Sequence, residues 1–98
     1  PPTAIFASND ISALGVMAAC QEFGLSIPSD ISIIGYDGIA LGALRTLSLT
    51  TVAQPLGLMG QVAAQRLFDR MAGTQIDDRS IVLEPELLTR GTTAPPRV

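Results

Sequence analysis

Two apolar runs in this chain end abruptly in polar residues, and this pattern constrains the fold more than any other feature. The first run reads Phe6-Ala-Ser-Asn-Asp10, and the second reads Ile33-Ile-Gly-Tyr-Asp-Gly38. In an open α/β sheet, ligands bind outside the carboxyl ends of the strands. Two strands that end this way in a short chain predict one small-molecule site, with Asn9, Asp10 and Asp37 on its rim.

The residues between the two runs predict a helix from about Asp10 to Phe23, which Gly24 allows to end in a left-handed conformation. The apolar stripe of this helix is expected to contain Ile11, Leu14, Ala18 and Leu25. The next strand, Ile31–Tyr36, is nearly all apolar, as is typical of a parallel strand covered on both faces. A strand, a helix and a strand in this order form a right-handed unit, which places Asn9 and Asp37 at the same edge of the sheet.

The remainder of the chain predicts a loop, a third strand, a second helix and a final extended segment. Residues 38–48 are typical of a loop, and Leu49–Ala53 is typical of a strand. The second helix begins at Pro55, a residue that suits the first helical position, and runs to about Ala72. The expected elements after it are a polar turn at Thr74–Ser80, an extended segment at Ile81–Arg90 and a tail at Ala94–Val98. This alternation of strands and helices predicts an α/β fold with a parallel sheet flanked by helices.

Composition places the chain among globular proteins and limits its partners. Its 98 residues, 47% hydrophobic and 15% charged, suffice for one small domain or part of a larger one. Because small domains bury a smaller share of their surface, part of this apolar surface is expected to face another domain or subunit. The net charge of −3, with the arginines scattered along the chain, argues against direct DNA binding by this piece.

The sequence contains no targeting signal, and it has few of the residues that form metal and catalytic sites. No apolar run approaches the length of a membrane span, no signal peptide is present, and no membrane partner is expected. The chain begins at Pro1 without a Met, so we expect it to be cut from a longer protein. Cys20 is the only cysteine and histidine is absent, which excludes an internal disulfide, a cysteine metal cluster, and most catalytic triads and zinc sites. The sequence therefore predicts no catalytic residue, no metal, no cofactor and no enzyme.

Several motifs, in order along nearly the whole chain, resemble the effector-binding region of the lactose-repressor/galactose-repressor (LacI/GalR) family of bacterial transcription regulators. Each motif alone is a weak signal, but the ordered set is specific. The matching stretches are Pro2-Thr-Ala-Ile-Phe-Ala-Ser-Asn-Asp10, Ala13-Leu-Gly15, Ile27-Pro-Ser-Asp-Ile-Ser-Ile-Ile-Gly-Tyr-Asp37, Leu49-Thr-Thr-Val-Ala-Gln-Pro55, Met59-Gly60 and Thr89-Arg-Gly-Thr-Thr-Ala-Pro95.

The resemblance implies a domain organisation. Members of the family carry an N-terminal helix-turn-helix headpiece and then a two-lobed sensor like the periplasmic sugar-binding proteins. This chain resembles the C-terminal part of that sensor, an incomplete domain of the type I periplasmic-binding-protein-like fold. Residues 1–54 would belong to the C-terminal lobe, the helix at 55–73 would pack on a missing N-terminal lobe, and 74–98 would form the return strand and tail. We therefore expect an apolar helix face that is exposed unless a partner covers it.

The resemblance also implies roles for single residues, each with a plainer alternative. Asn9 and Asp37 match positions that touch the effector, but they could equally cap a helix or form a turn. Gln54 either reaches the ligand or merely closes its strand, and Asp10 is expected to be structural. Leu14 and the loop around Arg45 match positions where relatives dimerise; their alternative is ordinary surface or core.

Two functions fit these residues. The first is the sensing part of a cytoplasmic regulator that binds a sugar or sugar derivative, forms a homodimer, and contacts operator DNA through the missing headpiece only. The alternative is a periplasmic sugar-binding protein of an uptake system. The motif Gly35-Tyr-Asp-Gly38 permits this alternative, since Gly38 replaces the second acid that is common in the LacI/GalR family. The turn Ile27-Pro-Ser-Asp30 and the ending Thr89-Arg-Gly-Thr-Thr-Ala-Pro95 favour the regulator. This piece alone is expected to bind effector weakly or not at all, and to self-associate.

Overall fold

The computed structural model describes residues 1–74 and 80–97 and divides the chain into two compact units. The first unit consists of Pro1–Gln54 with Glu86–Val98, and the second consists of Pro55–Pro85. The polar turn expected at Thr74–Ser80 lies largely outside the described residues. The candidate site residues Asn9, Asp37 and Gln54 all fall in the first unit.

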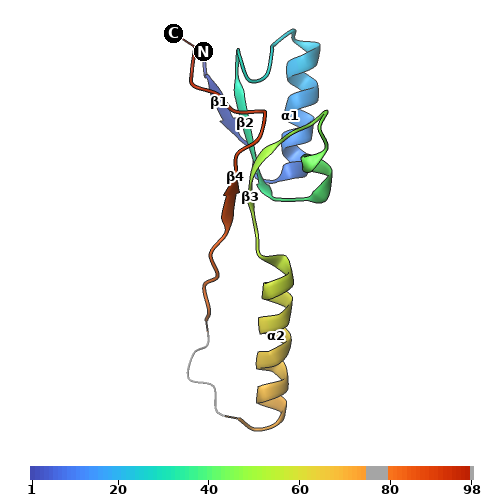
Figure 1. The fold of residues 1–98 in the computed structure, drawn as a ribbon, viewed down its shortest axis with the longest axis vertical. Helices are drawn as coiled ribbons and strands as arrows, with labels where there is room; N and C mark the ends of the chain where they lie inside the picture. Colours follow the sequence, from blue (N-terminus) through green and yellow to red (C-terminus); the bar gives the residue numbers. More distant parts are fainter. Residues whose placement is uncertain (75–79, 98) are drawn as a thin grey trace. The chain divides into compact units, whose positions relative to one another are not determined.

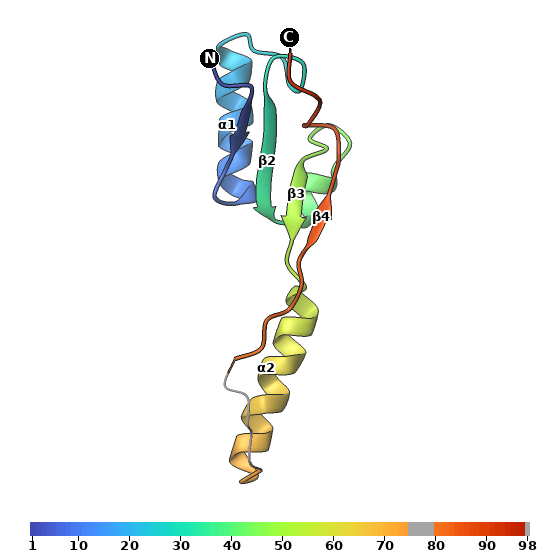
Figure 2. The same ribbon diagram turned by 90° about the vertical axis from the view of Figure 1, so that its left-hand side faces the viewer.

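The first unit is a four-stranded sheet with a helix packed against it (Figures 1 and 2). The strands are β1 (Ala4–Phe6), β2 (Ser32–Asp37), β3 (Thr50–Ala53) and β4 (Glu86–Leu88), in that spatial order. β1, β2 and β3 are parallel, and β4 runs antiparallel to β3. The predicted α/β fold with a parallel sheet is confirmed. Strand β4 lies within the extended segment predicted at Ile81–Arg90, but the sequence did not indicate its antiparallel pairing.

Helix α1 (Asp10–Glu22) begins and ends where the sequence predicts a helix, from about Asp10 to Phe23. At its start, Oδ1 of Asn9 accepts a hydrogen bond from the backbone N–H of Ser12 at 2.7 Å, which satisfies a free helix donor. At its end, Gly24 has a φ of 72°, a left-handed conformation that glycine adopts without steric cost. Helix α1 packs along β2 (Figure 1).

The buried face of α1 differs from the predicted stripe. Its buried residues are Asp10, Ala13 and Cys20, whereas Ile11 is 64% exposed. The small side chains of Ala13 and Cys20 allow the helix to approach the sheet closely, which a stripe of large residues would prevent. Cys20 is a free, buried thiol in the apolar core with Ile33 and Leu49.

The C-terminal segment after β4 is an integral part of the first unit rather than the start of a loose tail. Oγ1 of Thr92 accepts from the N–H of Thr50 at 2.9 Å and donates to the carbonyl of Ile33 at 2.7 Å. The N–H of Ala94 donates to Oγ of Ser32 at 3.1 Å, so the predicted tail begins later than Ala94. These bonds join the C-terminal segment to β2 and β3.

Replacement of Thr92 by valine, which has the same shape, is expected to lower the free energy of unfolding by about 1–3 kcal/mol. The substitution leaves the Thr50 N–H and the Ile33 carbonyl without their hydroxyl partner at a buried position. Urea unfolding of the chain measures the loss. Thr93→Val is the matched control, since it removes only a half-buried hydroxyl contact with Thr50 and should lower the free energy of unfolding less. Equal decreases for the two variants would refute the structural role given to Thr92.

The second unit contains helix α2 (Leu56–Met71), which confirms the predicted second helix. None of its residues is buried. Its exposed apolar side chains include Leu56, Leu58, Leu67, Phe68 and Met71. This confirms the expected exposed apolar helix face.

In the first unit, the loop expected at 38–48 contains a short 3-10 helix, η1 (Ala40–Ala43), which the sequence did not indicate.

Candidate functional site

Strands β2 and β3 bring Asp37 and Gln54 together at their carboxyl ends. Asp37 lies opposite Ala53 in the parallel register, so Gln54 follows one residue beyond. Nε2 of Gln54 donates a hydrogen bond to Oδ1 of Asp37 at 2.6 Å, and the Gln54 N–H donates to the Asp37 carbonyl at 3.1 Å. Both side chains are half-buried. The second carboxylate oxygen of Asp37 and the side-chain carbonyl of Gln54 lie outside this bond and provide two acceptors.

Asn9 lies at the same edge of the sheet. Phe6 of β1 pairs with Ile34 of β2, and Asn9 and Asp37 each follow three residues after that pair. The shared edge that the sequence predicts for Asn9 and Asp37 is therefore confirmed by the strand register. The side-chain oxygen of Asn9 caps α1, as its plainer alternative anticipated, and its NH₂ group lies outside that bond.

The backbone at Asp37 turns sharply out of the strand. Asp37 has a φ of 127°, which residues other than glycine rarely adopt, and Gly38 follows with a φ of 78°. A Cβ atom on Gly38 would lie 2.6 Å from the Cβ of Ala53, so the turn requires glycine at this position. Backbone strain of this kind costs on the order of 1–3 kcal/mol and persists only where the surrounding structure holds it in place.

Asp10 is fully buried, so its predicted place on the rim is wrong, while its expected structural role is confirmed. Its Oδ2 accepts hydrogen bonds from the N–H groups of Gly38 at 3.0 Å and Ile39 at 2.8 Å. Its Oδ1 accepts from Oγ1 of Thr51 at 2.6 Å. These contacts tie the first residue of α1 to β3 and to the turn after β2, a connection that the sequence reasoning missed.

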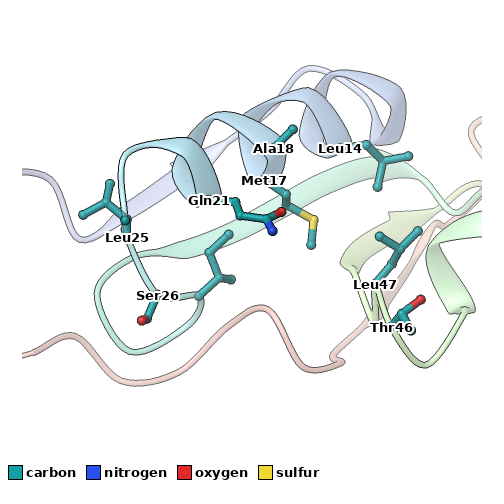
Figure 3. A pocket seen from close by; sticks show the side chains of 10 residues that line it. Leu14, Met17, Ala18, Gln21, Leu25, Ser26, Thr46 and Leu47 are labelled. Atoms are coloured by element: carbon teal, nitrogen blue, oxygen red, sulfur yellow. The ribbon is translucent and has the colours of Figure 1, made fainter.

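A separate apolar groove of about 550 Å³ lies between α1, the turn after it, and the loop before β3 (Figure 3). Leu14 and Met17 of α1 line one side, and Thr46 and Leu47 line the other. Leu14 was a predicted interface residue, and Arg45, the other, is exposed and directly precedes Thr46. The structure thus brings the two predicted interface segments to one surface.

A candidate metal site and a membrane-spanning helix are both absent from residues 1–74 and 80–97. Within these residues, no group of three or more His, Cys, Asp or Glu side chains could hold a metal ion. Across the same part of the chain, no helix combines the length and apolar character that a membrane crossing requires.

Comparison with known proteins identifies the class. Residues 1–93 match the family described as periplasmic binding protein-like domain. The chain is 42% identical over 93 residues to the HTH-type transcriptional repressor PurR of Proteus mirabilis, and 44% identical over 91 residues to that of Vibrio vulnificus. These matches cover 95% and 93% of this chain but 27% of each repressor, so the chain spans about a quarter of the length of these relatives.

Solved structures agree with this class. The dimeric Lac repressor with an 11-residue C-terminal deletion superimposes with a TM-score of 0.91 at 36% identity, over 98% of this chain and 35% of that one. A LacI-family regulator from Enterococcus faecium with bound ribose has a TM-score of 0.82 at 38% identity, over 97% of this chain and 35% of that one. The chain belongs to the periplasmic binding protein-like family. Within that family it corresponds to part of the effector-binding domain of LacI/GalR regulators.

Proposed function

We propose that this chain forms part of the effector sensor of a LacI-type transcriptional regulator, and that the effector is a sugar or a sugar derivative. The observation that carries the proposal is the Asp37–Gln54 pair at the carboxyl ends of two parallel strands. This edge is where ligands bind in open α/β sheets. Asn9 shares the edge and can offer its NH₂ group as a donor.

The chemistry of these side chains suits a polyhydroxylated ligand. A carboxylate accepts hydrogen bonds from two neighbouring hydroxyls, and an amide can both donate and accept. A site of this kind rejects ligands that leave its half-buried polar groups without partners. Structural neighbours support the sugar class, because LacI-family proteins from Arthrobacter and Alkaliphilus metalliredigens were solved with lactose and D-xylulofuranose respectively.

The proposal for the whole protein goes beyond this chain. A second lobe would complete the ligand site and cover the exposed apolar face of α2. A separate headpiece would contact operator DNA in the cytoplasm, and the ligand would shift the protein between DNA-binding states through its differential affinity for them. A periplasmic uptake protein has less support, since the relatives at about 40% identity are named as transcriptional repressors rather than as transport proteins or enzymes.

We place the homodimer contact on the apolar groove lined by Leu14, Met17 and Leu47. Apolar grooves on a globular surface mark interaction sites, and in a two-fold dimer the same surface patch of each copy faces the other. The Lac repressor neighbours are described as dimers, which supports a second copy as the occupant.

The effector site is tested by Asp37→Asn in the full-length protein. We expect the affinity for the bound sugar to fall about 10- to 100-fold, because hydrogen bonds to a charged group contribute roughly 1.5–3 kcal/mol. Calorimetric titration with D-ribose, lactose and D-xylulose measures the change. Asp30→Asn is the control, since Asp30 accepts a backbone hydrogen bond from Ser26 in the turn before β2, away from this edge. Unchanged affinity in Asp37→Asn, or a similar loss in both variants, would contradict the site.

A further inference from the structure

We propose that Asp10 is a positioning residue that holds the Asp37 carboxylate in its ligand-binding orientation without touching the ligand itself. The inference rests on the proposed function, because it assigns to Asp10 control over the geometry of the same site. The observation behind it is that one fully buried carboxylate binds the two N–H groups that directly follow Asp37.

The first step concerns the backbone of Asp37. The N–H of Gly38 belongs to the peptide group that leaves Asp37, so its 3.0 Å bond to Asp10 fixes the orientation of that peptide. The N–H of Ile39 donates to the same oxygen of Asp10 at 2.8 Å and fixes the orientation of the following peptide group. The φ of 127° at Asp37 is strained and needs such support, because a residue in this region relaxes when its surroundings allow it.

The second step concerns the side chain of Asp37. In the observed turn, its Oδ1 accepts a hydrogen bond from Nε2 of Gln54 at 2.6 Å. Relaxation of the turn would rotate the Asp37 carboxylate away from Gln54. The two side chains would then no longer offer their acceptors to a ligand together. Asp10 therefore acts on Gln54 through Asp37.

The third step concerns why Asp10 is not itself a ligand contact. Its side chain has no exposed surface, and both oxygens already accept hydrogen bonds from within the fold. No buried side-chain nitrogen or oxygen in the described part of the chain lacks a hydrogen-bond partner. The Asp10 carboxylate has room because residue 35 is a glycine. A Cβ atom on Gly35 would lie 2.3 Å from Oδ1 of Asp10.

The test compares Asp10→Ala and Asp10→Asn in the full-length protein by NMR, with selective ¹⁵N labelling of glutamine. In Asp10→Ala we expect the side-chain NH₂ signals of Gln54 to move to the positions seen in an Asp37→Ala reference, where their acceptor is gone. Asp10→Asn should keep the wild-type signals, because its carbonyl can accept from Gly38 and Ile39 while its NH₂ donates to Oγ1 of Thr51. A merely structural role would lower the melting temperature and leave these signals unchanged.

Sugar titration of the same variants gives the second readout. We expect Asp10→Ala to bind at least tenfold more weakly than wild type, and Asp10→Asn to retain most of the affinity. Wild-type Gln54 signals in folded Asp10→Ala would overturn the proposal. If Asp10→Ala does not fold, Asp10→Ser replaces it, because its short hydroxyl side chain cannot reproduce the carboxylate's bonds to both Gly38 and Ile39. A Gln54 shift toward the reference supports the proposal, and wild-type Gln54 signals overturn it. If the wild type binds no sugar, the proposed function fails while the Gln54 signals still test the positioning.

Discussion

Gly35→Ala is expected to destabilise the first unit by about 3 kcal/mol or more, since overpacking and lost buried hydrogen bonds combine. The added Cβ would lie 2.3 Å from Oδ1 of Asp10, 3.2 Å from its Cα, and 3.2 Å from Cδ2 of Leu49. Leu49 is fully buried and cannot move aside, so Asp10 must shift. That shift breaks the contacts of Asp10 with Gly38, Ile39 and Thr51.

Urea unfolding of the variant beside Gly15→Ala measures this effect. Gly15 lies on the exposed side of α1, where an added Cβ meets no atom within 4 Å. Alanine there is expected to stabilise the chain by about 0.5–1 kcal/mol, the usual gain for replacing glycine within a helix. The same chemical change thus has opposite expected signs at the two positions. Equal unfolding midpoints for Gly35→Ala and the wild type would refute the close packing of Asp10.

Leu14→Asp is expected to raise the dissociation constant of the proposed homodimer by about 100-fold or more, the size of effect seen at interface hot spots. Leu14 lines the groove opposite Leu47, as Figure 3 shows, and is half-buried in the single chain. In the proposed dimer the charge would lose its water without gaining a partner, which is costly. Sedimentation velocity of the full-length protein over a range of concentrations measures the shift toward monomer.

Ile11→Asp is the matched control for the dimer. Ile11 is on the same helix and is 64% exposed, but it does not line the groove. It should therefore leave the association unchanged. Circular dichroism spectra that match the wild type would show that both variants are folded. A dimer that is equally stable in Leu14→Asp and in the wild type would place the interface elsewhere.

The sequence predicted the elements whose signals are local. Asn9 and Gly24 mark the ends of α1, and the apolar run before Asp37 marks β2. Parallel strands then required Asn9 and Asp37 to share an edge, and the register agrees. Gln54 reached the same edge because β3 ends one residue earlier, at Ala53.

The remaining features depend on contacts between distant segments, which no local pattern records. Asp10 resembles an ordinary first-turn acid, yet its partners lie 28, 29 and 41 residues away. Gly35 gave one signal that could have been used, because a glycine inside a strand often marks the close approach of another group. The burial of Thr92 likewise follows from bonds to Ile33 and Thr50, more than 40 residues before it.

The assignment of the effector site is tested most directly by a crystal structure of the full-length protein with a bound sugar. We predict that the free carboxylate oxygen of Asp37 accepts hydrogen bonds from sugar hydroxyls, with Gln54 and Asn9 within hydrogen-bonding distance of the ligand. Asp10 should keep its bonds to Gly38 and Ile39 and make no contact with the sugar. A sugar bound away from the carboxyl ends of β2 and β3, with Asp37 contacting only protein atoms, would contradict the assignment.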